Sequence, residues 1–477
     1  MNRLRKLRAG GAASLRGRVL MLASGAAFSQ IIVVAASPII SRLYAPDDFG
    51  VTAGYAFLLN TLLAINSLRY EYAIPLPKDD DEALNLTGLT MGLVLLLSTL
   101  FTALIWALGV PIATLFNEPR IGMLLPLLPF GLIIVGFNMA LNYWATRREQ
   151  FETVSASHVL SNAGQTALQI AFGVAGFGLL GLGISYVIGQ ALMLLTLARV
   201  RFEWRKLRPR TWGALAVQHQ NFPLYSMPSS LIDIFGAQLP AVLLLALFSA
   251  EEAGYFSLTM RILGLPVGII GAAIAQTIYP ALTARRDQPE ETKQLFASMA
   301  SALLMVSLTG FGAVLVTGGW LFTIVFGEQW ATAGLYAQLL VPYFLVVFIA
   351  SPLSALALVR GRQKEVLWLT TMVTILRFGA LVVGGLLGSP ALAIALFSLV
   401  SFIIFLIYLL WLFHLAHIRL VAWLRTVRAF LAVFVALVGV GMASAASLPP
   451  LVHLGVFAVG FGLFGLFGWR RYGTVLR

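Results

Sequence analysis

The sequence predicts an all-α integral membrane protein with fourteen transmembrane helices, built as two six-helix lobes around a central cavity plus two C-terminal helices. Three observations support this fold class. Of the 477 residues, 59% are apolar and only 11% are charged, whereas soluble domains are roughly one quarter charged. The apolar runs are long enough to cross a bilayer as helices and lack the alternating period of barrel strands. Similar short motifs also recur in the same order in both halves of the chain.

Fourteen apolar segments have the length of a membrane-spanning helix. We expect these helices at residues 18–42, 48–74, 83–109, 120–145, 152–175, 179–199, 222–248, 252–281, 293–318, 331–358, 364–387, 390–414, 420–445 and 450–469. They divide the chain into a cytoplasmic basic arm (1–17), an N-terminal six-helix lobe (18–200) and a cytoplasmic linker (201–221). A C-terminal six-helix lobe (222–416) follows, and then two additional helices with a basic tail (417–477).

The distribution of basic residues supports this helix count and sets the orientation. With the N-terminus placed in the cytoplasm, nearly all of the 32 Lys and Arg residues fall on the inner side, which is the positive-inside pattern. The outer connections keep only Arg42 and Arg120. Both termini are therefore expected in the cytoplasm. The same pattern accounts for the formal net charge of +13 without a nucleic-acid partner.

An acidic turn occurs twice, as Asp-Asp-Phe-Gly at 47–50 and as Glu-Glu-Ala-Gly at 251–254. Acids suit the positive start of a helix and glycine relieves a tight turn, which is a sufficient structural explanation for either copy alone. Further matches follow in the same order, including LFNEPR with VFGEQW and TRREQF with VRGRQKEV. Because six is an even number, both six-helix halves start on the inner side. They are therefore parallel repeats that can rock around a cavity.

Two stretches of the first hundred residues, SRLYAPDDFG at 41–50 and SLRYEYAIPLPKDDDEALNL at 67–86, resemble a known transporter family. They are similar to the polysaccharide and O-antigen (lipid-linked oligosaccharide) flippases of the multidrug/oligosaccharidyl-lipid/polysaccharide exporter superfamily. The matching residues are Phe49, Gly50, Arg69, Tyr70, Glu71, Pro77, Lys78 and Asp79. The count of fourteen helices departs from the twelve usual in many sugar flippases and is closer to the peptidoglycan-precursor flippase.

The resemblance implies a transporter and not an enzyme. Its expected activity is translocation of an undecaprenyl-diphosphate-linked oligosaccharide from the cytoplasmic to the periplasmic leaflet of the bacterial inner membrane, by alternating access. The product would be a cell-surface polysaccharide such as O-antigen lipopolysaccharide or an exopolysaccharide. Expected partners are the lipid-linked oligosaccharide, membrane lipids, a polysaccharide polymerase and other assembly proteins. We expect no cofactor, and coupling to a proton or sodium gradient remains open.

Two other function classes stay open. A cation-coupled multidrug exporter of the same superfamily would need acids facing the N-terminal cavity, and that half shows no acid at mid-span. A membrane-embedded polysaccharide polymerase or glycosyltransferase would need a large loop or a catalytic domain, and every connection is short. Metal chemistry is not expected, because cysteine is absent and His414 and His417 have no carboxylate or thiolate nearby in sequence.

Arg261 and Asp233 are the first candidate site residues, since both fall near mid-depth in neighbouring spans. An arginine inside a membrane is costly, and its fork of donors suits a pyrophosphate. In this interpretation Arg261 holds the phosphate and Asp233 tunes it or binds a coupling cation. The alternative is a buried structural ion pair. Arg377 lies in the middle of its span, where cavity function competes with pairing inside the bundle.

Arg69 and Glu71 are expected near the inner end of the second helix. Two residues apart on a helix, their side chains would point in different directions and need other partners. Arg69 is a further candidate for the cavity, Glu71 for a charge pair, and interfacial anchoring is the alternative. Plausible sugar contacts are the amides in or near the spans, which the sequence does not rank: Gln30, Asn60, Asn138, Asn142, Asn162, Gln165, Gln238 and Gln276.

Overall fold

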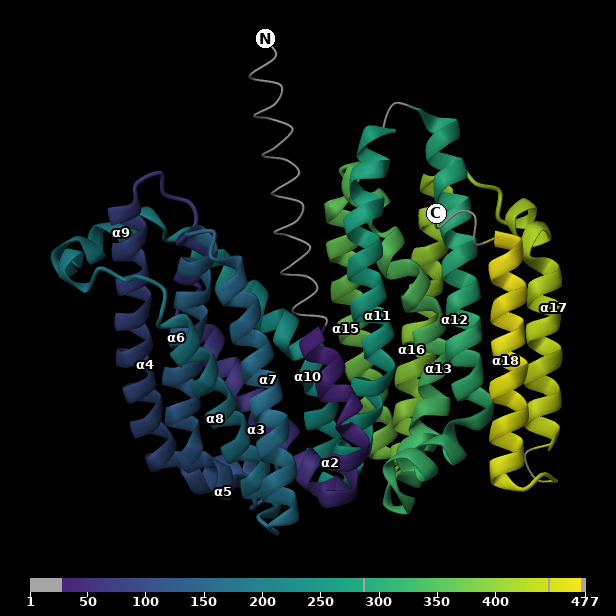
Figure 1. The fold of residues 1–477 in the computed structure, drawn as a ribbon, viewed down its shortest axis with the longest axis horizontal. Coiled ribbons are helices and arrows are strands. Elements are labelled where there is room, and N and C mark those ends of the chain that lie inside the picture. Colours follow the sequence, from purple (N-terminus) through teal and green to yellow (C-terminus); the bar gives the residue numbers. More distant parts are fainter. Residues whose placement is uncertain (1–27, 286–287, 445–446, 473–477) are drawn as a thin grey trace. The chain divides into compact units, whose positions relative to one another are not determined.

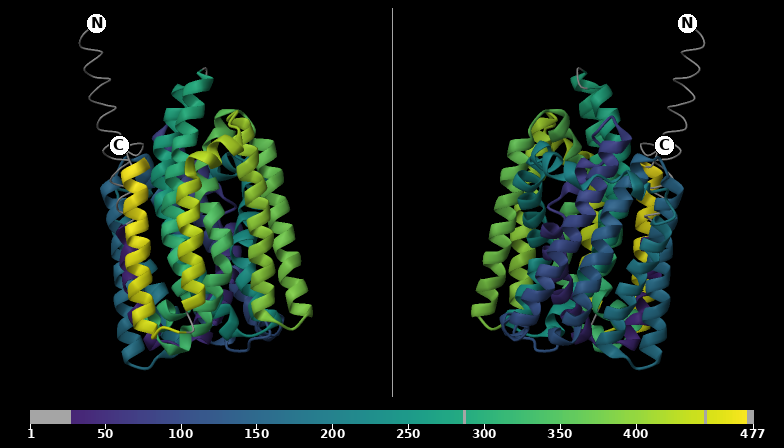
Figure 2. Two further views of the ribbon diagram at one scale, coloured as in Figure 1. Left: turned by 90° about the vertical axis from the view of Figure 1, so that its right-hand side faces the viewer. Right: turned by 90° about the vertical axis from the view of Figure 1, so that its left-hand side faces the viewer.

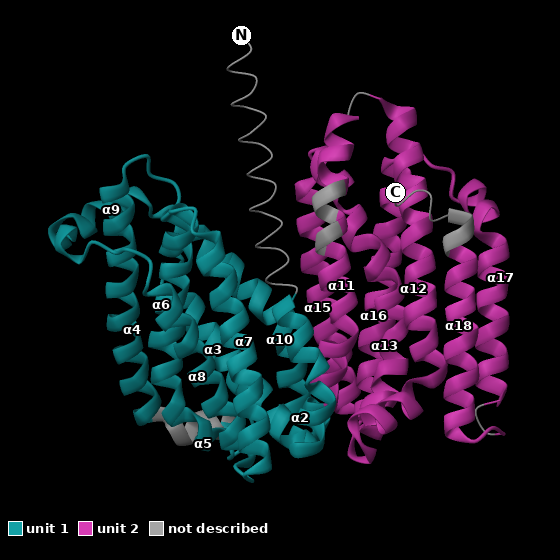
Figure 3. Cartoon of the chain, in the orientation of Figure 1, with its two compact units in different colours: residues 1–254 teal, residues 255–477 magenta. Residues whose placement is uncertain are grey.

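The computed structural model describes residues 28–285, 288–444 and 447–472, and every regular element in these ranges is helical (Figure 1). Residues are grouped into two compact units, Met1–Gly254 and Tyr255–Arg477 (Figure 3). The predicted all-α class is therefore confirmed. The basic arm at 1–17 lies outside the described residues.

The first unit contains helices joined by short turns. In chain order they are α2 (Ser37–Leu43), α3 (Pro46–Asn66), α4 (Asp80–Leu115), α5 (Ile121–Leu124), α6 (Leu128–Arg147), α7 (Phe151–Val174), α8 (Gly178–Leu197), α9 (Trp212–Gln218), α10 (Met227–Leu247) and the first turn of α11 (Ala250–Ala284). A 3₁₀ turn, η1 (Tyr70–Ala73), follows α3, and a π-helical turn, η5 (Phe222–Ser226), leads into α10.

The second unit contains the rest of α11 and the remaining helices. These are α12 (Pro289–Phe326), α13 (Ala331–Leu353), α14 (Ala355–Val359), α15 (Gln363–Leu386), α16 (Pro390–Leu415), α17 (Leu420–Ser444) and α18 (Pro450–Tyr472). The last two, the yellow helices of Figure 2, pack on each other and on α12. Stacked rings of Phe430 and Phe464, with centroids 3.9 Å apart, join them.

Twelve helices in the described part of the chain are long and apolar enough to cross a membrane. Two of the fourteen predicted spans are not among them. The first is described only as the shorter apolar helix Phe28–Leu43. The other missing span is the fifth of the fourteen, predicted at 152–175. It coincides with α7, which has 24 residues but carries many polar side chains. The chain is thus a multi-pass membrane protein, and the total of fourteen spans stays a prediction.

In the first unit α7 packs on α8, α6 packs on both α4 and α8, and α10 packs on α3. The ring of Phe235 meets Phe57 edge-on at 5.1 Å, and Asn60 donates a hydrogen bond to Gln238 at 3.3 Å. These contacts attach α10 to the helices before it, so the unit boundary falls inside α11 and not at residues 201–221. The predicted lobes at 18–200 and 222–416 describe the repeat and stay a prediction.

Candidate functional site

The five predicted charged residues fall on four segments. Asp233 is exposed on α10 of the first unit, and Arg261 is half-buried on α11 in the second unit. They belong to different compact units, and their pairing stays a prediction. Arg377 is half-buried on α15. Of these five residues, the described structure brings together only Arg69 and Glu71, in the turn after α3.

The expectation that Arg69 and Glu71 point apart on a helix is wrong, because α3 ends at Asn66. Leu68 and Arg69 then take left-handed backbone angles, with φ of 50° and 60°. This reversal brings the Arg69 Nη1 atom to 3.3 Å from Glu71 Oε1. Both residues are buried, with 9% and 0% of their surface exposed. The pair is a buried, mutually neutralised element of the first unit.

Arg377 sits among aromatic rings in the second unit. Its guanidinium carbon lies 4.6 Å from the ring centre of Tyr343 on α13, and 5.0 and 5.5 Å from those of Phe397 and Phe405 on α16. Its Nε donates to Ser401 Oγ at 2.7 Å. The buried Nη2 has no hydrogen-bond partner in the described part of the chain. Cation–π contacts hold this charge.

The two acidic turns, residues 46–50 and 250–254, lie against each other inside the first unit. A Cβ atom added to Gly50 would overlap the carbonyl oxygen of Ala250. In the same way, a Cβ atom added to Gly254 would overlap the carbonyl oxygen of Pro46. Ala250 lies four positions before Gly254, and Pro46 lies four positions before Gly50, so the contact is reciprocal. Only glycine lets two backbones approach this closely.

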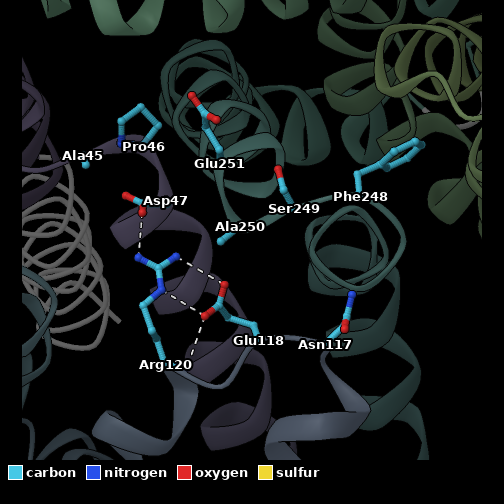
Figure 4. Close-up of a pocket in the computed structure, with 10 residues that line it drawn as sticks. All are labelled: Ala45, Pro46, Asp47, Asn117, Glu118, Arg120, Phe248, Ser249, Ala250 and Glu251. Carbon is cyan, nitrogen blue, oxygen red and sulfur yellow. Dashed lines mark hydrogen bonds and ion pairs between the residues drawn. The ribbon is translucent and has the colours of Figure 1, made fainter.

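A pocket of about 550 Å³ opens beside this glycine contact, at the helix ends that the charge pattern predicts to face outward (Figure 4). Arg120 lies between two acids there. Its Nη1 donates to Asp47 Oδ2 at 2.6 Å, and its Nε donates to Glu118 Oε1 at 3.0 Å. The two bonds raise the pKa of Arg120 above its ordinary value, and the bond that Glu118 accepts has the larger effect. Arg120 thereby ties the start of α3 to the turn before α5.

A second cavity, of about 300 Å³, lies between α6, α7 and α8. Its lining combines amide, hydroxyl and imidazole groups with apolar side chains and holds no Asp, Glu, Lys or Arg: Val135, Asn138, Met139, Asn142, Tyr143, His158, Ser161, Asn162, Tyr186, Gln190 and Met193. We call it the amide cavity. It explains the low hydropathy of α7, because His158, Ser161 and Asn162 of that helix face a cavity and not lipid.

The amide cavity has unused hydrogen-bonding capacity. Asn138 donates from Nδ2 to the Gln190 carbonyl at 2.9 Å, and the Asn142 amide meets the His158 ring at 3.2 Å. The Asn138 Oδ1 and Ser161 Oγ atoms are buried without a partner among the residues described. Such groups are costly unless a ligand or water satisfies them. The hydrogen-bonding capacity of the cavity lining is therefore only partly used within the described structure.

Sequence reasoning named three of these side chains, Asn138, Asn142 and Asn162, in its unranked set of amides, and the structure gathers them. It missed His158, Ser161, Tyr186 and Gln190. A usable signal was the row of polar residues along 157–165, at helical spacing inside a predicted span. Of the other candidates, Asn60 and Gln238 bond each other across α3 and α10.

Comparison with known proteins agrees with this fold. The family described as "Polysaccharide biosynthesis protein" matches residues 39–335, more than half of the chain. The chain is 21% identical to the teichuronic acid biosynthesis protein TuaB of Bacillus subtilis (strain 168), over 63% of this chain and 62% of that protein. It is also 21% identical to the succinoglycan biosynthesis transport protein ExoT of Rhizobium meliloti (strain 1021), over 62% and 59% of the two chains. The match thus spans about three fifths of each relative.

Solved structures show the same fold. The lipid II flippase MurJ, in an inward closed conformation, matches with a TM-score of 0.73 at 11% identity, covering 96% of this chain and 100% of that one. An inward-facing multidrug resistance MATE family transporter of the MOP superfamily matches with a TM-score of 0.64 at 16% identity, covering 81% and 95%. The predicted resemblance to a polysaccharide family is confirmed by the family match, and these structures show the fold. The expected class, a transporter and not an enzyme, agrees with these names.

Proposed function

Because this chain belongs to the polysaccharide biosynthesis protein family, we propose that it translocates an undecaprenyl-diphosphate-linked oligosaccharide across a bacterial inner membrane. The direction is from the cytoplasmic to the periplasmic leaflet. The observation that carries this proposal is the amide cavity, a space among membrane helices that amides and hydroxyls line together with apolar side chains, without Asp, Glu, Lys or Arg. Amides there can bond sugar hydroxyls, and the Tyr and Met side chains offer apolar surface to the faces of a sugar ring.

The lining of the amide cavity favours a glycan over a cationic drug. A cation held away from water needs a carboxylate nearby, and the lining contains none. The unpartnered oxygens of Asn138 and Ser161 accept hydrogen bonds, which sugar hydroxyls donate. A neutral sugar therefore satisfies the cavity without leaving a buried charge.

Transport in this proposal follows alternating access. The positive-inside pattern predicts both termini in the cytoplasm, and in this proposal the contact between the two acidic turns closes the periplasmic side. Outward opening then requires Gly50 to separate from Ala250 and Gly254 from Pro46. Backbone contacts through glycine pack closely without interlocked side chains, which suits a contact that forms and breaks in each cycle.

The diphosphate of the carrier lipid requires cationic hosts in a water-filled cavity. We assign this role to Arg377 and Arg261. The buried, unpartnered Nη2 of Arg377 supports it, because that donor remains available to an anion. Asp233, which is exposed on α10, is the residue we assign to proton or sodium coupling. Arg69 is not assigned a substrate role, since Glu71 already neutralises it.

The test is complementation of strains that lack their lipid-linked oligosaccharide flippase, across several glycan backgrounds. Asn162→Leu removes a cavity amide that makes no hydrogen bond in the described structure, and Thr166→Val, one turn further along α7 and outside the lining, is the matched control. We expect wild type and Thr166→Val to restore surface glycan and Asn162→Leu to lose most of it at equal membrane abundance. Equal activity of Asn162→Leu and wild type would contradict the assignment of the cavity.

A further inference from the structure

The second unit holds a separate basic pocket, of about 420 Å³, that the proposed function does not use. It lies where the turn between α14 and α15 meets the end of α16, and both helices pack on α16. The lining residues are Arg360, Arg362, Trp411, His414, Leu415 and His417. Four of these six side chains are arginine or histidine, so the pocket suits an anion.

Two tight turns fix the backbone of this basic pocket. Gly361 has φ of +72°, and the Arg362 amide donates to the Ala357 carbonyl at 2.8 Å. At the end of α16, His417 has φ of +56°, and the Ile418 amide donates to the Phe413 carbonyl at 3.0 Å. Both are six-residue helix-closing bonds of the Schellman type. The basic side chains thus project from rigid helix ends, which limits the entropy lost on binding.

The charge balance of the pocket is positive. Its two segments, 360–365 and 414–419, carry four Lys or Arg and two His against a single acid, Glu365. That acid is engaged by Arg362, whose Nη1 donates to Glu365 Oε1 at 2.7 Å. Arg360 has no carboxylate partner in the described residues. Each of the two histidine rings carries an N–H group that can donate to an anion.

The ligand class follows from the surroundings of the pocket. A guanidinium fork binds phosphate oxygens in pairs, and the imidazole N–H groups supply single donors. Trp411, stacked on Tyr408 with ring centres 5.8 Å apart, is an aromatic residue of the kind that lies at the level of lipid headgroups. A metal ion does not fit, because neither a thiolate nor an unpaired carboxylate lines the pocket.

We propose that this basic pocket binds the phosphate of an anionic phospholipid headgroup. The site is independent of glycan binding and lies outside the amide cavity. Free inorganic phosphate and the diphosphate of a carrier lipid offer the same chemistry, and the experiment separates these sources.

The test uses the purified full-length protein and measures binding of short-chain phosphatidylglycerol, with phosphatidylcholine of the same chain length as the neutral comparison. Arg360→Gln removes the unpaired guanidinium, and Arg425→Gln is the matched control, since Arg425 is an exposed arginine near the start of α17 and outside the pocket. Losing one charge-assisted bond weakens binding by about tenfold. We expect this loss for Arg360→Gln, near-wild-type binding for Arg425→Gln, and partial recovery in Arg360→Lys.

Separate arms replace the phospholipid by inorganic phosphate and by undecaprenyl diphosphate. Binding of phosphatidylglycerol that depends on Arg360 supports the proposal whatever the transport assay shows. Equal losses in Arg360→Gln and Arg425→Gln would overturn it, since a general surface charge would then explain binding. Dependence on Arg360 for inorganic phosphate alone, or for undecaprenyl diphosphate alone, would also overturn it. If Arg360→Gln does not fold, His414→Gln replaces it, with the same expected direction.

Discussion

Gly50 and Gly254 occupy equivalent places in two repeated turns, and each faces a backbone carbonyl of the other turn, that of Ala250 and that of Pro46. The two copies of the repeated turn are therefore in direct contact with each other. Acids alone would explain helix capping in each turn. The glycines are explained only by the close approach of the two backbones, because any side chain at either position would overlap a carbonyl oxygen.

The first prediction concerns this contact. Gly50→Ala and Gly254→Ala place a methyl group against a backbone oxygen that cannot rotate away. Overpacking of this kind costs about 1–3 kcal/mol, so the closed contact becomes rarer and transport is expected to fall by roughly tenfold. Surface glycan in the complementation assay measures the effect. The matched control is Gly122→Ala on α5, where an added Cβ meets nothing within 4 Å. Transport by Gly50→Ala at the level of Gly122→Ala would contradict the prediction.

The second prediction concerns the buried pair of Arg69 and Glu71. Replacing Arg69 by Met leaves the Glu71 carboxylate buried and unpaired, which costs about 3–5 kcal/mol. The double variant Arg69→Met/Glu71→Leu is expected to recover much of this loss, because no charge then remains in an apolar site. Thermal unfolding in detergent, together with membrane abundance, measures the loss in the single variant and the recovery in the double variant. A double variant less stable than either single variant would show that the pair itself provides the stability.

Arg377 gives the third prediction. Arg377→Gln removes the charge while a polar side chain can still reach Ser401, so the protein is expected in the membrane at normal abundance but without transport. Arg377→Lys is expected to keep part of the activity, because a lysine also makes cation–π contacts but offers no fork of donors. Ser401→Ala, which removes the partner of Arg377 Nε, serves as the comparison. Loss of the protein from the membrane in Arg377→Gln would assign Arg377 a structural role.

The fourth prediction concerns Arg120. Arg120→Gln breaks the bonds to Asp47 and Glu118. The side chains of Arg120 and Asp47 are 38% and 35% exposed, and that of Glu118 is 13% exposed. Water replaces much of the interaction, so the expected loss of stability is at most about 1 kcal/mol. Thermal unfolding at low and high salt measures it, and added salt should narrow the difference between variant and wild type. A loss as large as that for Arg69→Met would contradict this estimate.

Much of the fold could be predicted from the sequence, because spanning length and hydropathy alone define most of the helices. The end of α3 was not readable. Leu68 and Arg69 take left-handed angles that neither residue type favours, and no glycine or proline marks the break before Pro75. The predicted helix therefore ran on to residue 74, and the pairing of Arg69 with Glu71 was lost with it.

The candidate site was only partly readable. Single amides such as Asn138 and Asn162 stand out in an apolar chain, but which of them share a cavity depends on how α6, α7 and α8 pack. Pairing between helices is a tertiary property, and a single sequence does not show it. The same limit applied to the glycine contact. The sequence shows the two turns as a repeat, whereas only the structure shows that they meet in space.

The most direct test of the proposed transport cycle is to measure translocation while the two turns of the glycine contact are held together by a cross-link. The chain has no cysteine, so Ala45→Cys and Ser249→Cys, two exposed positions that line the same pocket, supply the only thiols for a short cross-linker. The protein is reconstituted into liposomes with a lipid-linked oligosaccharide, and its appearance in the opposite leaflet is measured. We predict translocation by the untreated double variant, arrest after cross-linking, and no arrest in either single-cysteine variant. Translocation that continues at the same rate after cross-linking would contradict the account.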